Sequence, residues 1–169
     1  MKIYKKDISI STTEEIKQVF IKEWGANYIV TKGKIINYND VKGFSLKINN
    51  KILGLITYLV KDNEIEITSL NSFYQNIGVG TLLLNTVIEK LNDKYKRIFL
   101  ITTNNNKNAL KFYKNRNFII KNIFKNSINE ARKIKPEIPK YDINGIEIKD
   151  EIELEYKQNA TFTSPNETV

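Results

Sequence analysis

Residues 64–91 carry the most restrictive pattern in this chain, EIEITSLNSFYQNIGVGTLLLNTVIEKL. The stretch begins with alternating apolar and polar residues, which predict a strand, and ends with apolar residues at helical spacing, which predict an amphipathic helix. Gln75, Gly78 and Gly80 lie in the turn between them. The first turn of a helix has N–H groups without intrahelical partners and a positive dipole end. The stretch therefore predicts an anion site, with a phosphate group as its expected occupant.

Composition limits the chemistry that the chain can perform. Its 169 residues, 41% of them apolar, fit one domain with a hydrophobic core. The sequence has no cysteine and no histidine, which excludes disulfides, thiolate nucleophiles and the catalytic triads that use histidine. The same absence removes nearly all zinc chemistry, so we expect no bound metal. A general base must then be Asp, Glu, Lys, Tyr or water.

The net charge of +8 is a reason to consider a nucleic-acid partner. The basic residues are spread along the chain and not gathered in one block, so nucleic acid is the weaker interpretation. The first ten residues, MKIYKKDISI, are charged and lack an apolar run. No stretch approaches the roughly 20 apolar residues that cross a bilayer. We therefore expect a cytoplasmic protein that has no membrane partner.

The remaining patterns predict a mixed α/β domain. Strands are expected at 3–10, 44–48, 52–60, 64–70, 97–103, 118–124 and 147–156. Helices are expected from the capping pattern Ser11–Glu14 to Gly25, from the glycine turn to Asn92, after Asn106, and over 127–133. Residues 28–36 are interpreted as a short strand followed by a loop. This order predicts a mixed sheet with helices on both faces, in one domain of residues 1–158 with a disordered tail at 159–169.

A second motif, NKNALKFY at residues 106–113, is followed by Asn117-Phe118. Together with QNIGVG at 75–80, it resembles the GNAT family of N-acetyltransferases. That family has a Gln/Arg-x-x-Gly-x-Gly/Ala loop, followed downstream by Asn-x-x-Ala-x-x-hydrophobic-Tyr and Gly-Phe. Asn117 replaces the glycine of the last pair, and asparagine tolerates the left-handed conformation that glycine adopts. The C-terminal segment is also similar to that of bacterial family members with no assigned substrate.

The resemblance implies acetyl-coenzyme A (acetyl-CoA) as cofactor. It also implies a mostly antiparallel sheet that splays between its fourth and fifth strands, here 64–70 and 97–103. Backbone N–H groups of the glycine turn would hold the pyrophosphate, and the pantetheine arm would pair with the strand edge at the splay and with Asn106. The N–H near Leu70 would stabilise the oxyanion of the tetrahedral intermediate. The implied cofactor-binding residues are Leu70, Ser72, Gln75, Asn76, Ile77, Gly78, Val79, Gly80, Thr81, Asn106, Ala109 and Phe112.

Two side chains are candidates for proton transfer. With the resemblance, Tyr113 is the candidate general acid, because a phenol (pKa about 10) and a leaving thiolate (conjugate pKa about 8.5) exchange a proton at small cost. Glu66 is the candidate general base, because alternation places it on one face with Glu64 and Thr68, nearer than Glu64 to the splay. A water chain is the alternative base. The structural alternatives are a core tyrosine and a solvated glutamate.

The resemblance implies transfer of an acetyl group from acetyl-CoA to a primary amine of a small molecule or peptide, by direct attack in a ternary complex. Toxin-type acetylation of aminoacyl-tRNA and a non-catalytic acetyl-CoA-binding sensor or subunit are the alternatives, and a homodimer is left open. The sequence does not identify the acceptor. We expect it to contact residues 20–43 and 127–146. Aromatic residues there are candidates for lining the acceptor pocket: Trp24, Tyr28, Tyr38 and Tyr141.

Overall fold

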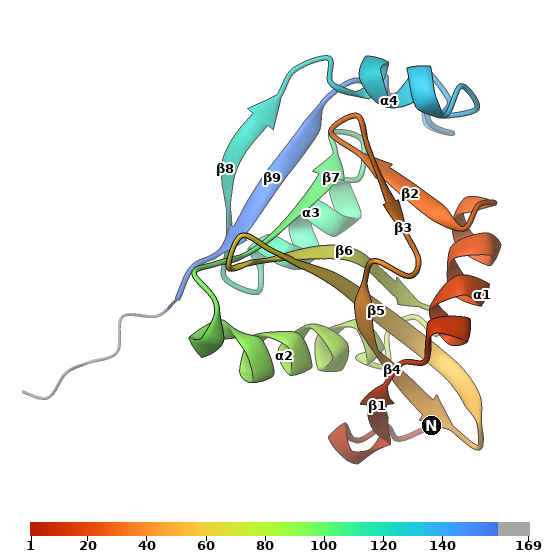
Figure 1. Ribbon diagram of the computed structural model, residues 1–169, viewed down its shortest axis with the longest axis vertical. Helices are drawn as coiled ribbons and strands as arrows, with labels where there is room; N and C mark the ends of the chain where they lie inside the picture. Colours follow the sequence, from red (N-terminus) through yellow and green to blue (C-terminus); the bar gives the residue numbers. More distant parts are fainter. Residues whose placement is uncertain (159–169) are drawn as a thin grey trace, which may run out of the picture.

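The central feature of the fold is a mixed sheet of seven strands, in the order β1-β4-β5-β6-β7-β9-β8 (Figure 1). The computed structural model describes residues 1–158, and the tail expected at 159–169 lies outside the described residues. The sheet strands are β1 (Ile8–Ile10), β4 (Lys42–Ile48), β5 (Lys51–Lys61), β6 (Glu64–Ser72), β7 (Ile98–Thr103), β8 (Phe118–Phe124) and β9 (Glu151–Tyr156). A separate hairpin consists of β2 (Tyr28–Thr31) and β3 (Lys34–Asn37). The helices are α1 (Thr13–Trp24), α2 (Val79–Leu91), α3 (Lys107–Lys114) and α4 (Ile128–Ile134), with short 3-10 turns at Lys5–Asp7 and Asn92–Lys94.

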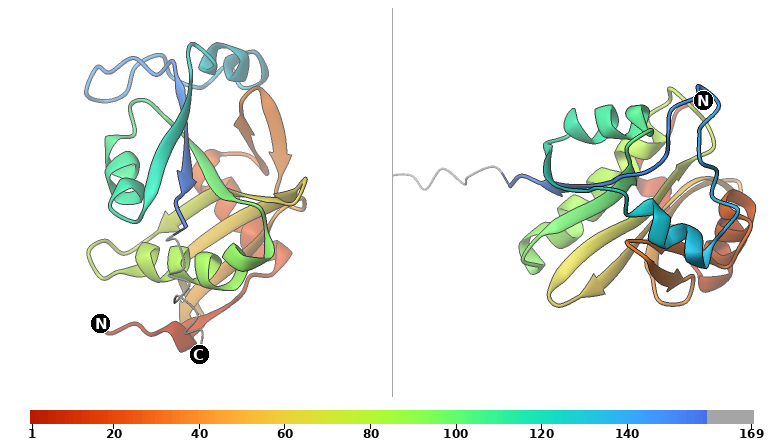
Figure 2. Two further views of the ribbon diagram at one scale, coloured as in Figure 1. Left: turned by 90° about the vertical axis from the view of Figure 1, so that its left-hand side faces the viewer. Right: turned by 90° about the horizontal axis from the view of Figure 1, so that it is seen from above.

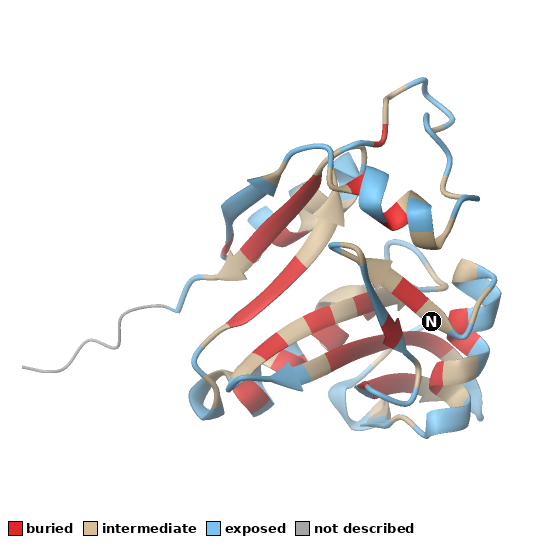
Figure 3. Ribbon diagram, turned by 45° about the horizontal axis from the view of Figure 1, so that its top comes forward, coloured by how far each residue is buried: buried red, intermediate tan, exposed pale blue. Residues whose placement is uncertain are grey.

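Helices cover both faces of this sheet, as expected. The apolar side of α2 packs with Tyr113 of α3 against the central strands in one core cluster. On the other face, α1 packs with the β2–β3 hairpin and Leu55 in a second cluster. Figure 2 shows α2 and α3 on one side of the sheet and α1, the hairpin and α4 on the other, and Figure 3 shows the buried residues running along the central strands. No helix within residues 1–158 is long and apolar enough to cross a membrane.

A close contact at Gly54 fixes the position of α2 against β5. A Cβ atom at this glycine would collide with the Val79 side chain and would lie 2.7 Å from the carbonyl oxygen of Asn71. Glycine therefore allows the first residue of α2 to rest directly on the sheet. This contact also positions the glycine turn that precedes α2.

Asparagine-rich turns connect the central strands as predicted. Asn49 and Asn50 have φ values of 50° and 64° between β4 and β5, and Asp62 and Asn63 have φ values of 51° and 62° between β5 and β6. Two consecutive residues with positive φ match the twist of a two-residue hairpin, and Asn and Asp tolerate that conformation. The expected left-handed conformation of Asn117 is also present, with φ of 64°.

Four local predictions were wrong. The segment 28–36 is not a strand and loop but the β2–β3 hairpin, which turns at Lys32 and Gly33 with φ of 46° and 66°. The strand expected over 3–10 is shortened to β1, because a 3-10 turn occupies Lys5–Asp7, and the last strand begins at Glu151 and not at 147. The cap of α1 is Thr12, not Ser11: its hydroxyl accepts the N–H of Glu15 at 3.2 Å.

The sheet splays between β6 and β7, which confirms the expected architecture. These two strands are parallel and pair only where Ile65–Ile67 meets Ile98–Leu100. Beyond that point β6 stays paired with β5 as far as Ser72, and β7 stays paired with β9 as far as Thr103. The facing edges of β6 and β7 therefore separate toward the glycine turn, and the candidate site lies in this gap.

Candidate active site

A β-bulge at Thr68 marks the start of the splay. Tyr58 pairs with Ile67 and Thr57 pairs with Ser69, so Thr68 has no partner on β5. The Thr57 hydroxyl lies 2.7 Å from the Thr68 hydroxyl and 2.6 Å from the Ser69 hydroxyl, which places both β6 side chains on one face. One extra residue in a strand shifts its alternation by one position. A simple period of two, as used for the sequence prediction, fails beyond this residue.

The bulge turns the backbone N–H of Leu70 into the splay. Before the bulge, the N–H of Ile65 donates to the Arg97 carbonyl oxygen at 2.9 Å, on the β7 side. After it, the N–H of Phe73 donates to the Leu53 carbonyl oxygen at 2.9 Å, on the β5 side. N–H groups of alternate residues point to the same side of a strand. The N–H groups of odd-numbered residues after the bulge therefore point to β5, and the N–H of Leu70 points into the gap.

The turn before α2 presents a free helix N-terminus. Asn76 and Gly78 both have left-handed backbones, with φ of 61° and 86°. Gly78 is the N-cap of α2, and no side chain of residues 1–158 caps this helix. By contrast, the side-chain amide oxygen of Asn106 accepts the N–H of Ala109 at 3.2 Å and caps α3. The first N–H groups of α2 are consequently available to an anion, as the sequence predicts.

Gly80 differs from Gly54, which close packing requires, and from Gly78, whose φ is 86°. Its φ is not positive, and a Cβ atom there would meet only the Phe112 ring, at 3.5 Å, and Leu70, at 3.9 Å. These are ordinary van der Waals distances, so neither the backbone nor the packing of the protein demands glycine. A residue without a side chain at this position leaves the helix N-terminus open to close approach by a ligand.

A groove of about 610 Å³ runs from this turn along α3. Every residue that the sequence analysis assigned to the cofactor lines it, except Ile77 and Asn106. Ile77 packs against the main core cluster, and Asn106 lines a second cavity. The residues that line the groove are Leu70, Ser72, Tyr74, Gln75, Asn76, Gly78, Val79, Gly80, Thr81, Asn108, Ala109, Phe112, Tyr113 and Arg116.

Arg116 is a groove residue that the sequence analysis missed. Its guanidinium donates to the Thr81 hydroxyl at 2.7 Å and to the Phe112 carbonyl oxygen at 2.8 Å, and lies 3.8 Å from the centre of the Phe112 ring. Its Nε is buried without a partner among the described residues. A guanidinium fixed beside free helix N–H groups suits a phosphate. The signal in the sequence that points to Arg116 is the rarity of arginine, which makes up only three of the 27 basic residues.

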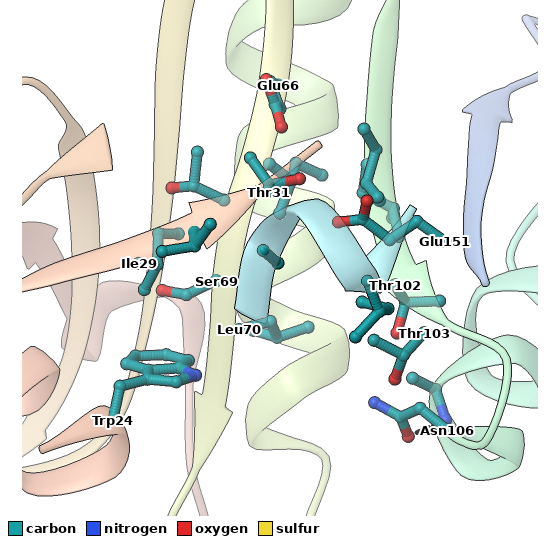
Figure 4. A pocket seen from close by; sticks show the side chains of 18 of the residues that line it. Trp24, Ile29, Thr31, Glu66, Ser69, Leu70, Thr102, Thr103, Asn106 and Glu151 are labelled. Atoms are coloured by element: carbon teal, nitrogen blue, oxygen red, sulfur yellow. Dashed lines mark hydrogen bonds between the residues drawn. The ribbon is translucent and has the colours of Figure 1, made fainter. Parts of the chain in front are cut away.

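A second cavity, of about 380 Å³, lies on the other side of the splay (Figure 4). It shares Leu70, Ala109 and Tyr113 with the groove, so the two spaces meet at these three residues. Its walls come from the end of α1, from β2, β6 and β7, from α3 and α4, and from the start of β9. Of the four aromatic residues expected to line an acceptor pocket, Trp24 lines this cavity. The other three do not: Tyr28, Tyr38 and Tyr141.

Tyr113 lies at the junction of the two spaces. Its ring packs edge-on against Phe112 and Phe118, with ring centres 5.1 and 5.4 Å away. The residue is 7% exposed, and burial raises the pKa of its phenol well above the ordinary value. The hydroxyl therefore keeps its proton at neutral pH, as a general acid must.

Glu66 lines the second cavity, and its carboxylate has no hydrogen-bond or ion-pair partner within residues 1–158. Burial raises its pKa; Lys32 opposes this shift, and the carboxylates of Glu153 and Glu151 add to it. Its neighbour on the same face, Glu64, is instead paired with Arg97 at 3.0 Å, and this bond lowers the pKa of Glu64. Of these two glutamates, Glu66 is the better base near neutral pH.

Comparison with known proteins assigns this arrangement to a family. Residues 11–118, more than half of the chain, match the acetyltransferase (GNAT) family. The chain belongs to the GNAT family. Two curated relatives from Bacillus subtilis, both uncharacterised, are similar over most of their length. YxbD is 40% identical over 141 residues, which cover 82% of this chain and 89% of YxbD. YdhI is 41% identical over 135 residues, which cover 79% of this chain and 84% of YdhI.

Solved structures of acetyltransferases share the fold at low sequence identity. A GNAT acetyltransferase from Elizabethkingia anophelis with acetyl-CoA bound is 24% identical, with a TM-score of 0.65 and coverage of 90% of this chain and 99% of that one. The IAA acetyltransferase from Bacillus cereus is 19% identical, with a TM-score of 0.70 and coverage of 89% and 98%. The ribosomal-protein-S18-alanine N-acetyltransferase from Escherichia coli is 16% identical, with a TM-score of 0.61 and coverage of 91% and 97%. The GNAT fold of the chain is thereby confirmed.

Proposed function

We propose that this protein transfers an acetyl group from acetyl-CoA to a primary amine of a small molecule or peptide, by direct attack within a ternary complex. Membership of the GNAT family supports acetyl-CoA as the donor. The observation that carries the proposal is the junction at Leu70, Ala109 and Tyr113, where the anion-binding groove meets the cavity that contains Glu66. Two substrates bound in these two spaces would touch only there.

The residues of the groove fit coenzyme A. Uncapped N–H groups at the start of α2 and the Arg116 guanidinium suit its phosphates, and the room above Gly80 allows them to come close. The N–H of Leu70 is oriented to donate a hydrogen bond to a carbonyl oxygen in the splay, which is where negative charge develops during acyl transfer. Acetyl-CoA would supply the activated acetyl thioester.

Glu66 and Tyr113 divide the two proton transfers. The Glu66 carboxylate takes the proton that the acceptor ammonium must lose before its nitrogen can attack, directly or through a water molecule. The Tyr113 hydroxyl gives its proton to the leaving sulfur. Burial raises the pKa of the phenol, and the same apolar surroundings raise the basicity of a thiolate formed beside it, so the two groups remain matched.

The test is a coenzyme A release assay over a panel of polyamines, aminoglycosides, amino acids and peptides. We expect turnover with at least one amine, and Tyr113→Phe should lower kcat by about 10²- to 10⁴-fold, the usual contribution of general acid catalysis. Tyr58→Phe is the matched control, because Tyr58 is 8% exposed against 7% for Tyr113 but lies outside both spaces. Unchanged turnover in Tyr113→Phe would refute the acid role. Tight acetyl-CoA binding without turnover on any amine would instead favour the non-catalytic sensor.

A further inference from the structure

Two neighbouring glutamates on β9 are equally buried but differently partnered. Glu151 and Glu153 are each 3% exposed and lie on the same face of the strand. The Glu153 carboxylate is balanced by the Arg97 guanidinium at 2.9 Å and also accepts the Asn122 amide at 3.1 Å. The Glu151 carboxylate accepts only the backbone N–H of Lys32, at 2.9 and 3.2 Å from its two oxygens. No cationic side chain of residues 1–158 forms an ion pair with it.

A buried carboxylate without a counter-cation is unfavourable, and it gains strongly when a cation is placed beside it. Glu151 lines the second cavity, so the space for such a cation is present. The Lys32 N–H holds the carboxylate at the tip of the β2–β3 hairpin, which orients it before any ligand arrives. Glu153, two residues further along the same strand, already has such a cation beside it, the Arg97 guanidinium.

The charged residues that line the cavity, among the described residues, are all acidic. Glu66 and Glu151 are its only charged residues within the described chain, and no lysine or arginine lines it. Lys32 and Lys34 lie close enough to lower the pKa of Glu66, but neither side chain reaches the cavity. The hydroxyl of Thr31, which also lines the cavity, is buried without a hydrogen-bond partner in residues 1–158. These observations point to a ligand that brings positive charge and hydrogen-bond donors.

The cavity also offers apolar surface beside the two carboxylates. Glu66 is on β6 and Glu151 on β9, with β7 between them, and they face the cavity from different sides (Figure 4). Apolar side chains make up much of the remaining wall, among them Trp24, Ile29 and Ile138. An aliphatic chain with a charged nitrogen at each end matches this distribution of charge.

We propose that the acceptor is an aliphatic diamine or larger polyamine. Its reacting nitrogen loses a proton to Glu66, directly or through a water molecule, and its second, charged nitrogen binds Glu151. This inference rests on the proposed function. It makes Glu151 a specificity-determining residue that distinguishes a dication from a monoamine of the same length.

The experiment compares diaminoalkanes of three to six carbons with the monoamines of equal length, in wild type, Glu151→Gln and Glu153→Gln. We expect wild-type kcat/KM to favour the best diamine by about 10- to 100-fold, the range of a hydrogen bond to a buried charged group. In Glu151→Gln this ratio should fall to near one through a higher KM for the diamine. Any change in kcat that comes from the altered surroundings of the Glu66 carboxylate should be the same for both amines. Glu153→Gln should lose thermal stability, because Arg97 loses a partner, yet keep the wild-type ratio.

Two results would overturn the inference while the enzyme remains active: no preference for diamines in wild type, or an equal loss of kcat/KM for both amines in Glu151→Gln. If no amine releases coenzyme A, the proposed function fails, and binding then decides the inference separately. Diamines should raise the Tm of the coenzyme A complex of wild type but not that of Glu151→Gln. Absence of this stabilisation in wild type, or its persistence in the variant, would refute Glu151 as the cation site.

Discussion

The substitution Gly80→Ala separates a glycine required by a ligand from one required by packing. The nearest atoms that a Cβ at Gly80 would meet are 3.5 Å away, in the Phe112 ring, and the position is helical. Alanine is favoured over glycine in a helix by about 0.5–1 kcal/mol. We therefore expect the ligand-free variant to be at least as stable as wild type, with a gain of up to about 1 kcal/mol, or roughly 2–4 °C in Tm for a chain of this size.

The same variant should bind coenzyme A poorly. The added methyl group would stand at the N-terminus of α2, where phosphate oxygens must reach the backbone N–H groups. Loss of one charge-assisted hydrogen bond corresponds to about 1.5–3 kcal/mol, or roughly 10- to 100-fold in Kd. Isothermal titration calorimetry with coenzyme A measures the affinity, and calorimetric melting measures stability in the absence of ligand.

Gly54→Ala is the matched control for packing. Its Cβ would collide with Val79 and approach the Asn71 carbonyl oxygen to 2.7 Å, and a backbone atom cannot move away cheaply. Overpacking of this kind costs about 1–3 kcal/mol, so this variant should melt at a lower temperature even without ligand. The reasoning would be refuted if Gly80→Ala bound coenzyme A as tightly as wild type, or if it were destabilised as much as Gly54→Ala.

Three further predictions concern single side chains. Because burial raises the pKa of Glu66 above its value in the unfolded chain, its contribution to stability is present at low pH and is lost as pH rises through the folded pKa. Glu66→Gln should therefore raise Tm at pH 7, and it should abolish the acidic limb of the kcat/KM profile; a limb that persists would favour a water chain as base. Arg116→Gln should weaken coenzyme A about 10- to 100-fold in calorimetry without changing the KM for the acceptor, and equal affinity would exclude a phosphate contact. Asn106→Ala should destabilise the protein by about 0.5–2 kcal/mol in denaturant melts, whereas Asn106→Asp should keep the cap of α3; equal stability of the two variants would contradict the capping role.

Much of the fold follows from local chemistry in the sequence. The turns at Asn49-Asn50 and Asp62-Asn63 were predictable because Asn and Asp are among the few residues that adopt positive φ readily. The left-handed conformation of Asn117 followed for the same reason. The β2–β3 hairpin was not predictable in this way, since Lys32 adopts φ of 46° without belonging to that group of residues.

The site was predictable only where it lies along one segment. The glycine turn is one continuous segment and the Tyr113 helix is another. Nearly all of the residues predicted in these two segments line one groove. The bulge at Thr68 has no equivalent local signal, although it decides which way the N–H of Leu70 points. Glu151 lines the cavity because β9 pairs with β7, and these two segments are about fifty residues apart in the sequence. Alternation alone gives the face of such a residue but not the strand that it lies beside.

Mass spectrometry of the amine after incubation with acetyl-CoA and the protein tests the central claim most directly, with an aliphatic diamine as acceptor. Direct attack in a ternary complex predicts one acetylated amine for each free coenzyme A, with no acetyl group on the protein at any time. Release of coenzyme A without an acetylated amine, or an acetylated protein that forms before the product, would contradict it.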